Sequence, residues 1–588
     1  MKISGLLGLA IGTLLASQPS TTKADSADAA LDRFFRTHLD ARFELRPMEA
    51  TWLGDHRFGN RLDDLSPEAR TRWRQLLRAT LRDLPRLVDY RRLTRDGQID
   101  FEILRHELQT QLWLAEYTRP WEDDPRIYNR YLSDSTYLLL AQSTLPLDTR
   151  LDQVLARMAQ MPRIVASARA NLKRPPRTHT ETAIRQNRGT LAYYQDTLLT
   201  LAGDTPRVAE LRAAAVPVLA ALHEHQRFLE DELLPRADGD WRLGRRKFAR
   251  KLELTLNAGL TADEVLAEAE AEFTRVEDEL FVIARQVWGR HFPRQPIPPD
   301  DPEGRRETVA RVLAEVSRDH GTPDSLVDDV RSQVAALRTF IAEHDILRLP
   351  EPDRCEIIEM PEFQRGNSTA YMNSPPPLDP LATGYYAVSP PPRDWDADRV
   401  RSYLEEYNRH MLQILSIHEA YPGHYVQLEY ANRHPSLVRK VFGSGVYIEG
   451  WAVYTERTML DQGYGDGDPS LRLMQLKFYL RAVANAILDH RMHCTGMTED
   501  EAMDLLARRS YQSEGEARLK VVRARQSSVQ LSTYFVGRMA FQRLRRAIQR
   551  EQGDAFDLGR FHEAALAPGS VPVKYLPELV RRHLTEPR

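Results

Sequence analysis

Residues 404–424 read LEEYNRHMLQILSIHEAYPGH, and their apolar positions recur with the spacing of a helix. The side chains that follow one another at intervals of three and four residues are Leu404, Tyr407, Met411, Leu415 and His418. This spacing predicts an amphipathic helix whose buried stripe continues into His418. A lone histidine that faces a core is more often a hydrogen-bonded structural residue than a ligand, so the meaning of His418 depends on its neighbours.

A second histidine, His424, stands six positions after His418. In a regular helix of about 3.6 residues per turn, these side chains would lie about 240° apart and could not share a face. Pro422 and Gly423 lie between them. Proline removes an N–H, and glycine permits conformations closed to other residues, so we expect a local widening of the helix that turns His424 back toward His418. HEAYPGH would then be a metal site different from the H-E-x-x-H zinc motif, rather than a broken copy of it.

A carboxylate further along the chain is the candidate third ligand, which a zinc hydrolase needs besides an open position for water. Glu449 lies 25 residues after His424 in the helical stretch VYIEGWAVYTERTML, and Gly450 beside it would allow close approach of a helix. Glu456 falls on the same face and is a candidate to orient a histidine. Pairing of Glu456 with Arg457 at the surface is an equally favoured alternative.

Glu419 directly follows His418 and is the candidate general base. In H-E-x-x-H metalloproteases the corresponding glutamate stands beside the water at the metal. Zinc lowers the pKa of that water to about 7, and Glu419 would take its proton and return it to the leaving amine. Two histidines and one carboxylate suit a single Zn²⁺ ion, although they do not exclude another divalent metal.

The first half of the chain has a helical pattern. At 588 residues the protein is too long for one compact core, which predicts two or more lobes. From about residue 28 to residue 344, apolar residues recur at helical spacing, and Thr261 and Glu264 form a predicted capping box. We expect residues 25–345 to be a helical N-terminal region that frames the site.

The composition changes in the middle of the chain. Residues 354–360 and 384–389 have the composition of strands, and proline-rich sequence separates them. Helical patterns resume at residue 396. The predicted fold is therefore mainly α, multi-helical, with one small β-sheet near the site, and residues 346–588 form the catalytic region.

The overall composition is that of an ordinary globular protein. Hydrophobic residues make up 42% and charged residues 28%, and the net charge of −3 shows no bias toward nucleic acid. The two cysteines, Cys355 and Cys494, are too few for a disulfide scaffold. The sequence leaves open whether they form one disulfide bridge or stay as two free thiols.

Residues 1–24 have the three parts of a cleavable signal peptide. Lys2 is the positive end, residues 3–16 are the apolar core, and residues 22–24 are a small-residue cleavage site. The apolar run is too short for a permanent membrane span, and no cysteine follows it for lipid attachment. We expect a secreted or periplasmic protein.

The sequence resembles a bacterial family known as domain of unknown function 885, whose motifs are H-E-x-x-P-G-H and E-G-W-A-x-Y-x-E. They occur here as HEAYPGH and EGWAVYTE. The likeness covers nearly the whole mature chain, with further matches in RPMEATWLGDHRFGNRLDDLSPEA, LDHRMHCTGMTEDEA and QLSTYFVG. It implies a helical, deep-cleft, zincin-like metallopeptidase with His418, His424 and Glu449 as zinc ligands and Glu419 as base.

The resemblance also implies roles beyond the metal ligands. Asp489 and His493 match the family's D-x-x-x-H, and Tyr534 lies in its Q-x-x-x-Y-x-x-G. Tyr534 is the first candidate, and His493 the second, to stabilise an oxyanion. Asp489 would support the site from a second layer or be purely structural. Where the family has Pro-Gly-Gln before the tyrosine helix, this chain has Ser-Val-Gln at 528–530, which predicts a differently shaped loop.

Two further features are candidates for binding substrate. Arg523 matches a family arginine and would bind a substrate carboxylate, or form a buried structural ion pair. Tyr385 and Tyr386 lie on a predicted strand whose edge would pair with an extended peptide, unless that strand belongs to the core.

Three functional hypotheses follow. The leading one is a zinc peptidase acting on short or flexible peptides, with water at the metal as nucleophile. The second is a zinc hydrolase of other amides, and the third is a catalytically silent protein that binds peptide or metal. Glu419 disfavours the third, because a binding scaffold does not need that carboxylate. Oligomeric state and the choice between exopeptidase and endopeptidase stay open.

Overall fold

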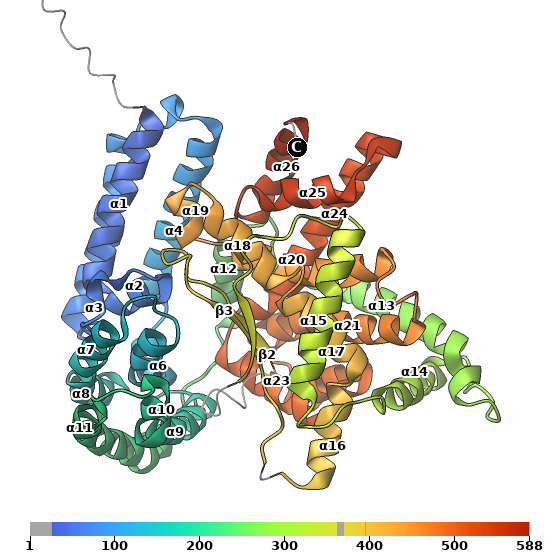
Figure 1. The fold of residues 1–588 in the computed structure, drawn as a ribbon, viewed down its shortest axis with the longest axis horizontal. Helices are drawn as coiled ribbons and strands as arrows, with labels where there is room; N and C mark the ends of the chain where they lie inside the picture. Colours follow the sequence, from blue (N-terminus) through green and yellow to red (C-terminus); the bar gives the residue numbers. More distant parts are fainter. Residues whose placement is uncertain (1–25, 361–369, 394, 587–588) are drawn as a thin grey trace, which may run out of the picture.

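The structure of the protein, a computed structural model, describes residues 26–360, 370–393 and 395–586 (Figure 1). It is mainly helical with one small sheet, which confirms the predicted fold class at that level. The predicted signal peptide at residues 1–24 lies outside the described residues. Among the described residues, no helix has the length and apolar character needed to cross a membrane.

The helices before the sheet account for the first half of the chain. Their bounds are α1 Ala27–Leu45, α2 Pro47–Leu53, α3 Pro67–Leu87, α4 Arg95–Tyr117, α5 Pro120–Asp123, α6 Arg126–Ala141, α7 Leu147–Met158, α8 Met161–Asn171, α9 Arg177–Ala192, α10 Leu198–Ala202, α11 Val208–Arg227, α12 Gly244–Leu256, α13 Ala262–His291, α14 Pro302–Ser317 and α15 Leu326–Glu343. The capping box predicted at Thr261 and Glu264 is present at the start of α13.

The helices after the sheet carry the motif residues. Their bounds are α16 Ala397–Glu406, α17 Arg409–Glu419, α18 His424–Arg433, α19 Leu437–Val441, α20 Gly445–Asp461, α21 Pro469–Cys494, α22 Glu499–Met503, α23 Glu514–Gln526, α24 Thr533–Gln552, α25 Leu558–Leu566 and α26 Leu576–Thr585. Cys355 and Cys494 are not paired, so the alternative with two free thiols holds.

The sheet has three strands, β1 Cys355–Glu359, β2 Ala370–Asn373 and β3 Gly384–Val388, in the order β1-β3-β2. β1 runs parallel to β3 and β2 runs antiparallel to it. β1 and β3 were predicted, whereas β2 lies in the segment interpreted as proline-rich loop. Because Tyr385 and Tyr386 lie on the central strand, the expectation that they line a free edge is wrong. β2 is an edge strand instead.

The buried apolar residues form two clusters. One is built from residues between Met48 and Leu233, mainly on α6 to α11, and Figure 1 shows α7 to α11 gathered at the lower left, away from α24 to α26. The other joins α1, α3 and α4 to α12 and the later elements. The early helices α1, α3 and α4 therefore belong to the same core as the candidate site.

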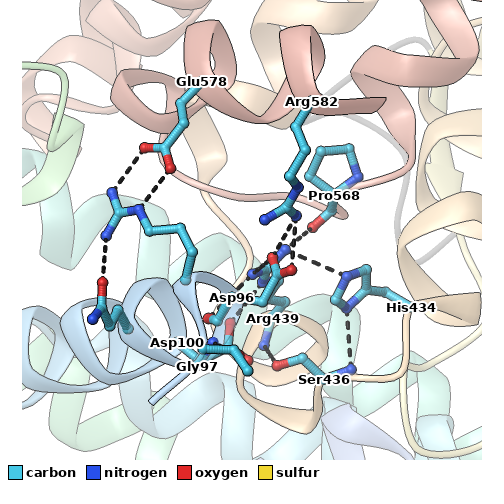
Figure 2. A network of polar contacts seen from close by, with 12 residues as sticks. Asp96, Gly97, Asp100, His434, Ser436, Arg439, Pro568, Glu578 and Arg582 are labelled. Carbon is cyan, nitrogen blue, oxygen red and sulfur yellow. Dashed lines mark hydrogen bonds and ion pairs between the residues drawn. The ribbon is translucent and has the colours of Figure 1, made fainter. Parts of the chain in front are cut away.

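A buried arginine ties the early helices to the C-terminal ones (Figure 2). Arg439 on α19 is 2% exposed, and its guanidinium donates to Asp100 on α4 at 2.6 Å and to Asp96 at 2.8 Å. It also donates to the carbonyl oxygen of Pro568, while Arg582 on α26 binds Asp96. Loss of one partner of a buried ion pair leaves an uncompensated charge, so this cluster couples α4, α19 and α26 strongly.

Two glycines allow α20 and α24 to cross at very short range. A Cβ atom added at Gly450 would lie 2.3 Å from the backbone of Gly537, and one added at Gly537 would lie 1.9 Å from the carbonyl oxygen of Val446. Gly450 therefore permits close helix approach, as its position beside Glu449 predicts. The partner helix is α24.

Replacing Gly450 by alanine is expected to lower the free energy of unfolding by about 1–3 kcal/mol, because a methyl group against backbone atoms forces the two helices apart. Gly289→Ala is the matched control. A Cβ atom at Gly289, on α13, would meet no atom within 4 Å, so we expect a gain of about 0.5–1 kcal/mol from improved helix propensity. Urea denaturation of both variants measures the difference, and equal effects would contradict the close crossing.

Candidate metal centre

The helix that carries His418 is shorter than its apolar pattern predicts. α16 ends at Glu406, and Asn408 caps the start of α17 by accepting hydrogen bonds from the backbone N–H groups of His410 and Met411. The predicted stripe from Leu404 to His418 therefore spans two helices. An asparagine side chain that satisfies the first N–H groups of a helix favours a new start over continuation.

The two histidines of HEAYPGH lie on different helices. α17 ends at Glu419 and α18 begins at His424, so the expected widening of one helix is wrong. Pro422 cannot continue the helix, and the chain turns back over the last turn of α17. A Cβ atom at Gly423 would lie 1.9 Å from the carbonyl oxygen of His418, so only glycine fits this close return. The turn brings His424 back beside His418.

The structure brings together the three predicted ligands, His418, His424 and Glu449. Their candidate ligand atoms all lie within 4.8 Å of one another. Oε2 of Glu449 is 3.4 Å from Nε2 of His424 and 3.8 Å from Nε2 of His418. Zinc bound tetrahedrally at about 2.0–2.2 Å places neighbouring ligand atoms about 3.3–3.6 Å apart, so both distances from Glu449 lie within or close to this range, and two histidines with one carboxylate are a donor set that suits zinc.

The orientation of His418 is set by Glu456. Nδ1 of His418 lies 2.8 Å from Oε1 of Glu456, whose side chain is fully buried. When Nδ1 donates to this carboxylate, the lone pair stays on Nε2, the atom that faces Glu449. Burial, reinforced by His424, lowers the pKa of His418 to about 3, so its imidazole is neutral as a ligand requires. The alternative in which Glu456 pairs with Arg457 is wrong, because Arg457 instead contacts the carboxylates of Glu279 and Asp461.

The candidate base, Glu419, is held by the sheet. Its Oε2 accepts a hydrogen bond of 3.0 Å from the backbone N–H of Met372 on β2. Burial raises the pKa of Glu419 to about 7, against the opposing effect of His424. A carboxyl group with this pKa accepts and releases a proton readily near neutral pH. Sequence reasoning missed Met372, because the short strand β2 has no pattern that separates it from the surrounding loop.

Tyr534 lies at the α20–α24 crossing, one turn before Gly537. Its hydroxyl oxygen accepts hydrogen bonds of 3.2 Å from Arg523 and from Gln530, so its own hydrogen can be donated elsewhere. Burial and the charge of Glu449 raise the pKa of Tyr534. Burial alone would raise the pKa of Glu449. The hydrogen bond from His424 and positive charges that include Arg523 instead hold this pKa below its ordinary value. Tyr534 and Arg523 therefore lie within electrostatic reach of the ligand cluster.

Asp489 supports the loop before α24. Its carboxylate accepts from the backbone N–H of Val529 and from the hydroxyl of Ser532, both at 2.9 Å. Val529 has a φ of 73°, which lies in the left-handed region that glycine adopts most readily. The hydrogen bond that the N–H of Val529 donates to Asp489 therefore helps to hold a strained backbone in place.

The structure does not bring His493 to the cluster as a donor to substrate. Nε2 of His493 contacts the carbonyl oxygens of Ala524 and Ser527 at 3.1 and 2.9 Å, and Nδ1 accepts from the N–H of Leu243 at 3.4 Å. Because both ring nitrogens already have backbone partners, the expectation of an oxyanion donor loses its support. His493 instead holds the end of α23 and the loop that leads to Tyr534.

One further side chain near the cluster escaped the sequence analysis. Lys520 on α23 is 5% exposed, and its charge interacts with Glu449 and Arg523. A lysine in a charged helix is normally solvated, so the sequence contains no signal for its burial.

Comparisons with known proteins agree with this fold. The profile of the family "Bacterial protein of unknown function (DUF885)" matches residues 47–580, and the chain belongs to this family. A solved structure from Shewanella oneidensis, titled a "putative lipoprotein of unknown function", is 33% identical with a TM-score of 0.79 and covers 94% of this chain and 99% of its own. A "putative lipoprotein" from Colwellia psychrerythraea is 17% identical and shares the fold, with a TM-score of 0.77. The match covers 95% of this chain and 99% of the Colwellia chain. Among curated proteins, none matches.

Proposed function

We propose that this protein is a zinc-dependent metallopeptidase with a zincin-like site that hydrolyses short or flexible peptides. One observation carries the proposal: His418, His424 and Glu449, from three helices, converge within 4.8 Å, and Glu419 adjoins the cluster. The hydrogen bond between Glu456 and His418 supports it, because zinc-bound histidines commonly donate their second nitrogen to a carboxylate.

The metal and the side chains around the cluster would each have a separate role in amide hydrolysis. Bound zinc would act as a Lewis acid toward the substrate carbonyl and would lower the pKa of water. Glu419 would take a proton from the attacking water on its free carboxylate oxygen and deliver it to the leaving nitrogen. The hydroxyl of Tyr534 would donate a hydrogen bond to the carbonyl oxygen as negative charge develops there, while Arg523 and Gln530 hold that hydroxyl in place.

We also propose that the protein acts outside the cytoplasm, in the periplasm or after secretion. The signal-peptide pattern of residues 1–24 supports export. The solved relatives bear the word lipoprotein in their titles, whereas the first cysteine of this chain is Cys355. Cell fractionation with an antibody against the C-terminal region tests the location, and recovery in the cytoplasm alone would contradict export.

Metal removal tests the proposed activity. The purified protein is expected to contain one zinc ion per chain by elemental analysis and to cleave members of a mixed peptide library. A chelator should abolish cleavage and added zinc should restore it, because the proposed chemistry needs the ion. Full cleavage by metal-free protein would contradict the proposal. Zinc bound at one ion per chain without cleavage of any peptide would point to another amide.

A further inference from the structure

We infer that Lys520 and Arg523 bind the C-terminal carboxylate of a peptide, so that the enzyme removes short fragments from C-terminal ends. The two cations lie one turn apart on α23 and share a face of this helix. This inference rests on the proposed peptidase function and specifies its substrate class as peptides with a free C-terminus.

Lys520 is a buried basic side chain that lacks an ion-pair partner in contact. It is 5% exposed and makes no hydrogen bond or ion pair with any other residue in the described part of the chain. Burial, together with Arg481 and Arg523, holds the pKa of Lys520 well below its ordinary value. Arg481 forms an ion pair with Glu516 at 3.0 Å, whereas Glu516 and Glu449 act on Lys520 only from beyond ion-pair distance. A buried ammonium group without an ion-pair partner in contact costs stability, and an arriving anion would reduce that cost.

Arg523 contributes a guanidinium group that is also without a carboxylate. Among the described residues, its hydrogen-bond partners are the neutral side chains of Gln530 at 2.8 Å and Tyr534 at 3.2 Å. The alternative that Arg523 forms a buried structural ion pair is therefore not what the structure shows. The planar fork of arginine matches the two oxygens of a carboxylate.

The other cations of α23 differ from this pair. Arg518 forms an ion pair with Glu514, and Arg525 forms one with Glu499. The contrast singles out Lys520 and Arg523 as the cations of α23 that are available to a ligand, and both interact with the charge of Glu449. Arg523 also donates to the hydroxyl of Tyr534, the proposed oxyanion donor, so the ligand carboxylate would lie near the scissile bond.

The end of a peptide chain fits this pair better than an internal acidic side chain. Because Lys520 is almost completely buried, a chain that continued past its ammonium group would need space inside the packed protein. A terminal carboxylate reaches such a group without a following residue. An acidic side chain offers the same chemistry, so the experiment separates the two sources.

Binding measurements test the inference independently of catalysis. Zinc-loaded Glu419→Gln protein is titrated by calorimetry with three peptides of otherwise equal sequence: a free acid, its C-terminal amide, and an amide whose last residue is glutamate. We expect the free acid to bind about 10- to 100-fold more tightly than either amide, because charge-assisted hydrogen bonds are lost on amidation. Lys520→Met and Arg523→Met should each reduce this preference, and Arg518→Gln should keep it.

Each outcome decides between the alternatives. Equal affinity for the free acid and the plain amide overturns the inference, and so does a glutamate amide that binds as tightly as the free acid. A preference for the free acid in a protein that cleaves no peptide would leave the carboxylate site standing and remove the proposed function. Lys520→Met should also raise the melting temperature, because it removes a buried amine that has no ion-pair partner in contact, whereas removal of a structural lysine would lower the melting temperature.

Discussion

Replacing Glu419 by glutamine is expected to lower the rate of peptide hydrolysis by about 100- to 10,000-fold while zinc stays bound. Glutamine has nearly the same shape, and its amide oxygen can still accept the hydrogen bond from the backbone of Met372. It cannot take up a proton from water. The loss should therefore appear in kcat with little change in fold, as measured by peptide turnover, zinc content and circular dichroism.

The same substitution at Glu405 on α16 is the control, because this glutamate lies away from the three ligands in the chain and belongs to another helix. We expect turnover within about twofold of the wild-type value, as for substitutions remote from a site. Undiminished turnover by zinc-loaded Glu419→Gln protein would remove Glu419 from the mechanism.

Glu449→Ala is expected to weaken zinc binding by more than about 100-fold and to abolish hydrolysis. The change removes one of three protein ligands, which should cost more than the 10- to 100-fold that loss of an outer hydrogen-bond partner typically costs. Competition against a chromophoric chelator measures the affinity. Glu456→Gln should weaken zinc binding by about 10- to 100-fold, because it perturbs the orientation of His418 and leaves all three ligands present.

The order of these two effects is as informative as their size. If Glu456→Gln weakened zinc binding more than Glu449→Ala did, Glu449 would not be a ligand. Zinc affinity unchanged in both variants would place the ion elsewhere in the protein.

The residues of the candidate site could be predicted because their signals are local. A proline and a glycine between two histidines predict that a regular helix is interrupted there, and the structure shows a turn between two helices at Gly423 in place of the expected widening. Glu449 and Glu456 share a helix face, so one observation about helix geometry places both toward the histidines. The mainly helical fold followed from periodicity, and two of the three strands followed from local composition.

Other features depend on contacts between distant segments, which one sequence does not encode locally. The start of α17 at Asn408 depends on a cap that competes with an unbroken apolar stripe. Strand β2 is recognisable only once it pairs with β3. The burial of Lys520 depends on how α23 packs against other helices, and the partners of His493 lie more than 30 residues away along the chain.

The surroundings of Arg439 have a consequence for how the protein matures. Its acceptors are contributed by Asp96, Asp100 and Pro568, which are separated by more than 450 positions. The buried cluster around Arg439 can therefore form only when translation has almost finished. Late folding of this cluster would leave time for a nascent polypeptide to pass through a translocation channel before it becomes rigid, which fits the export proposed above.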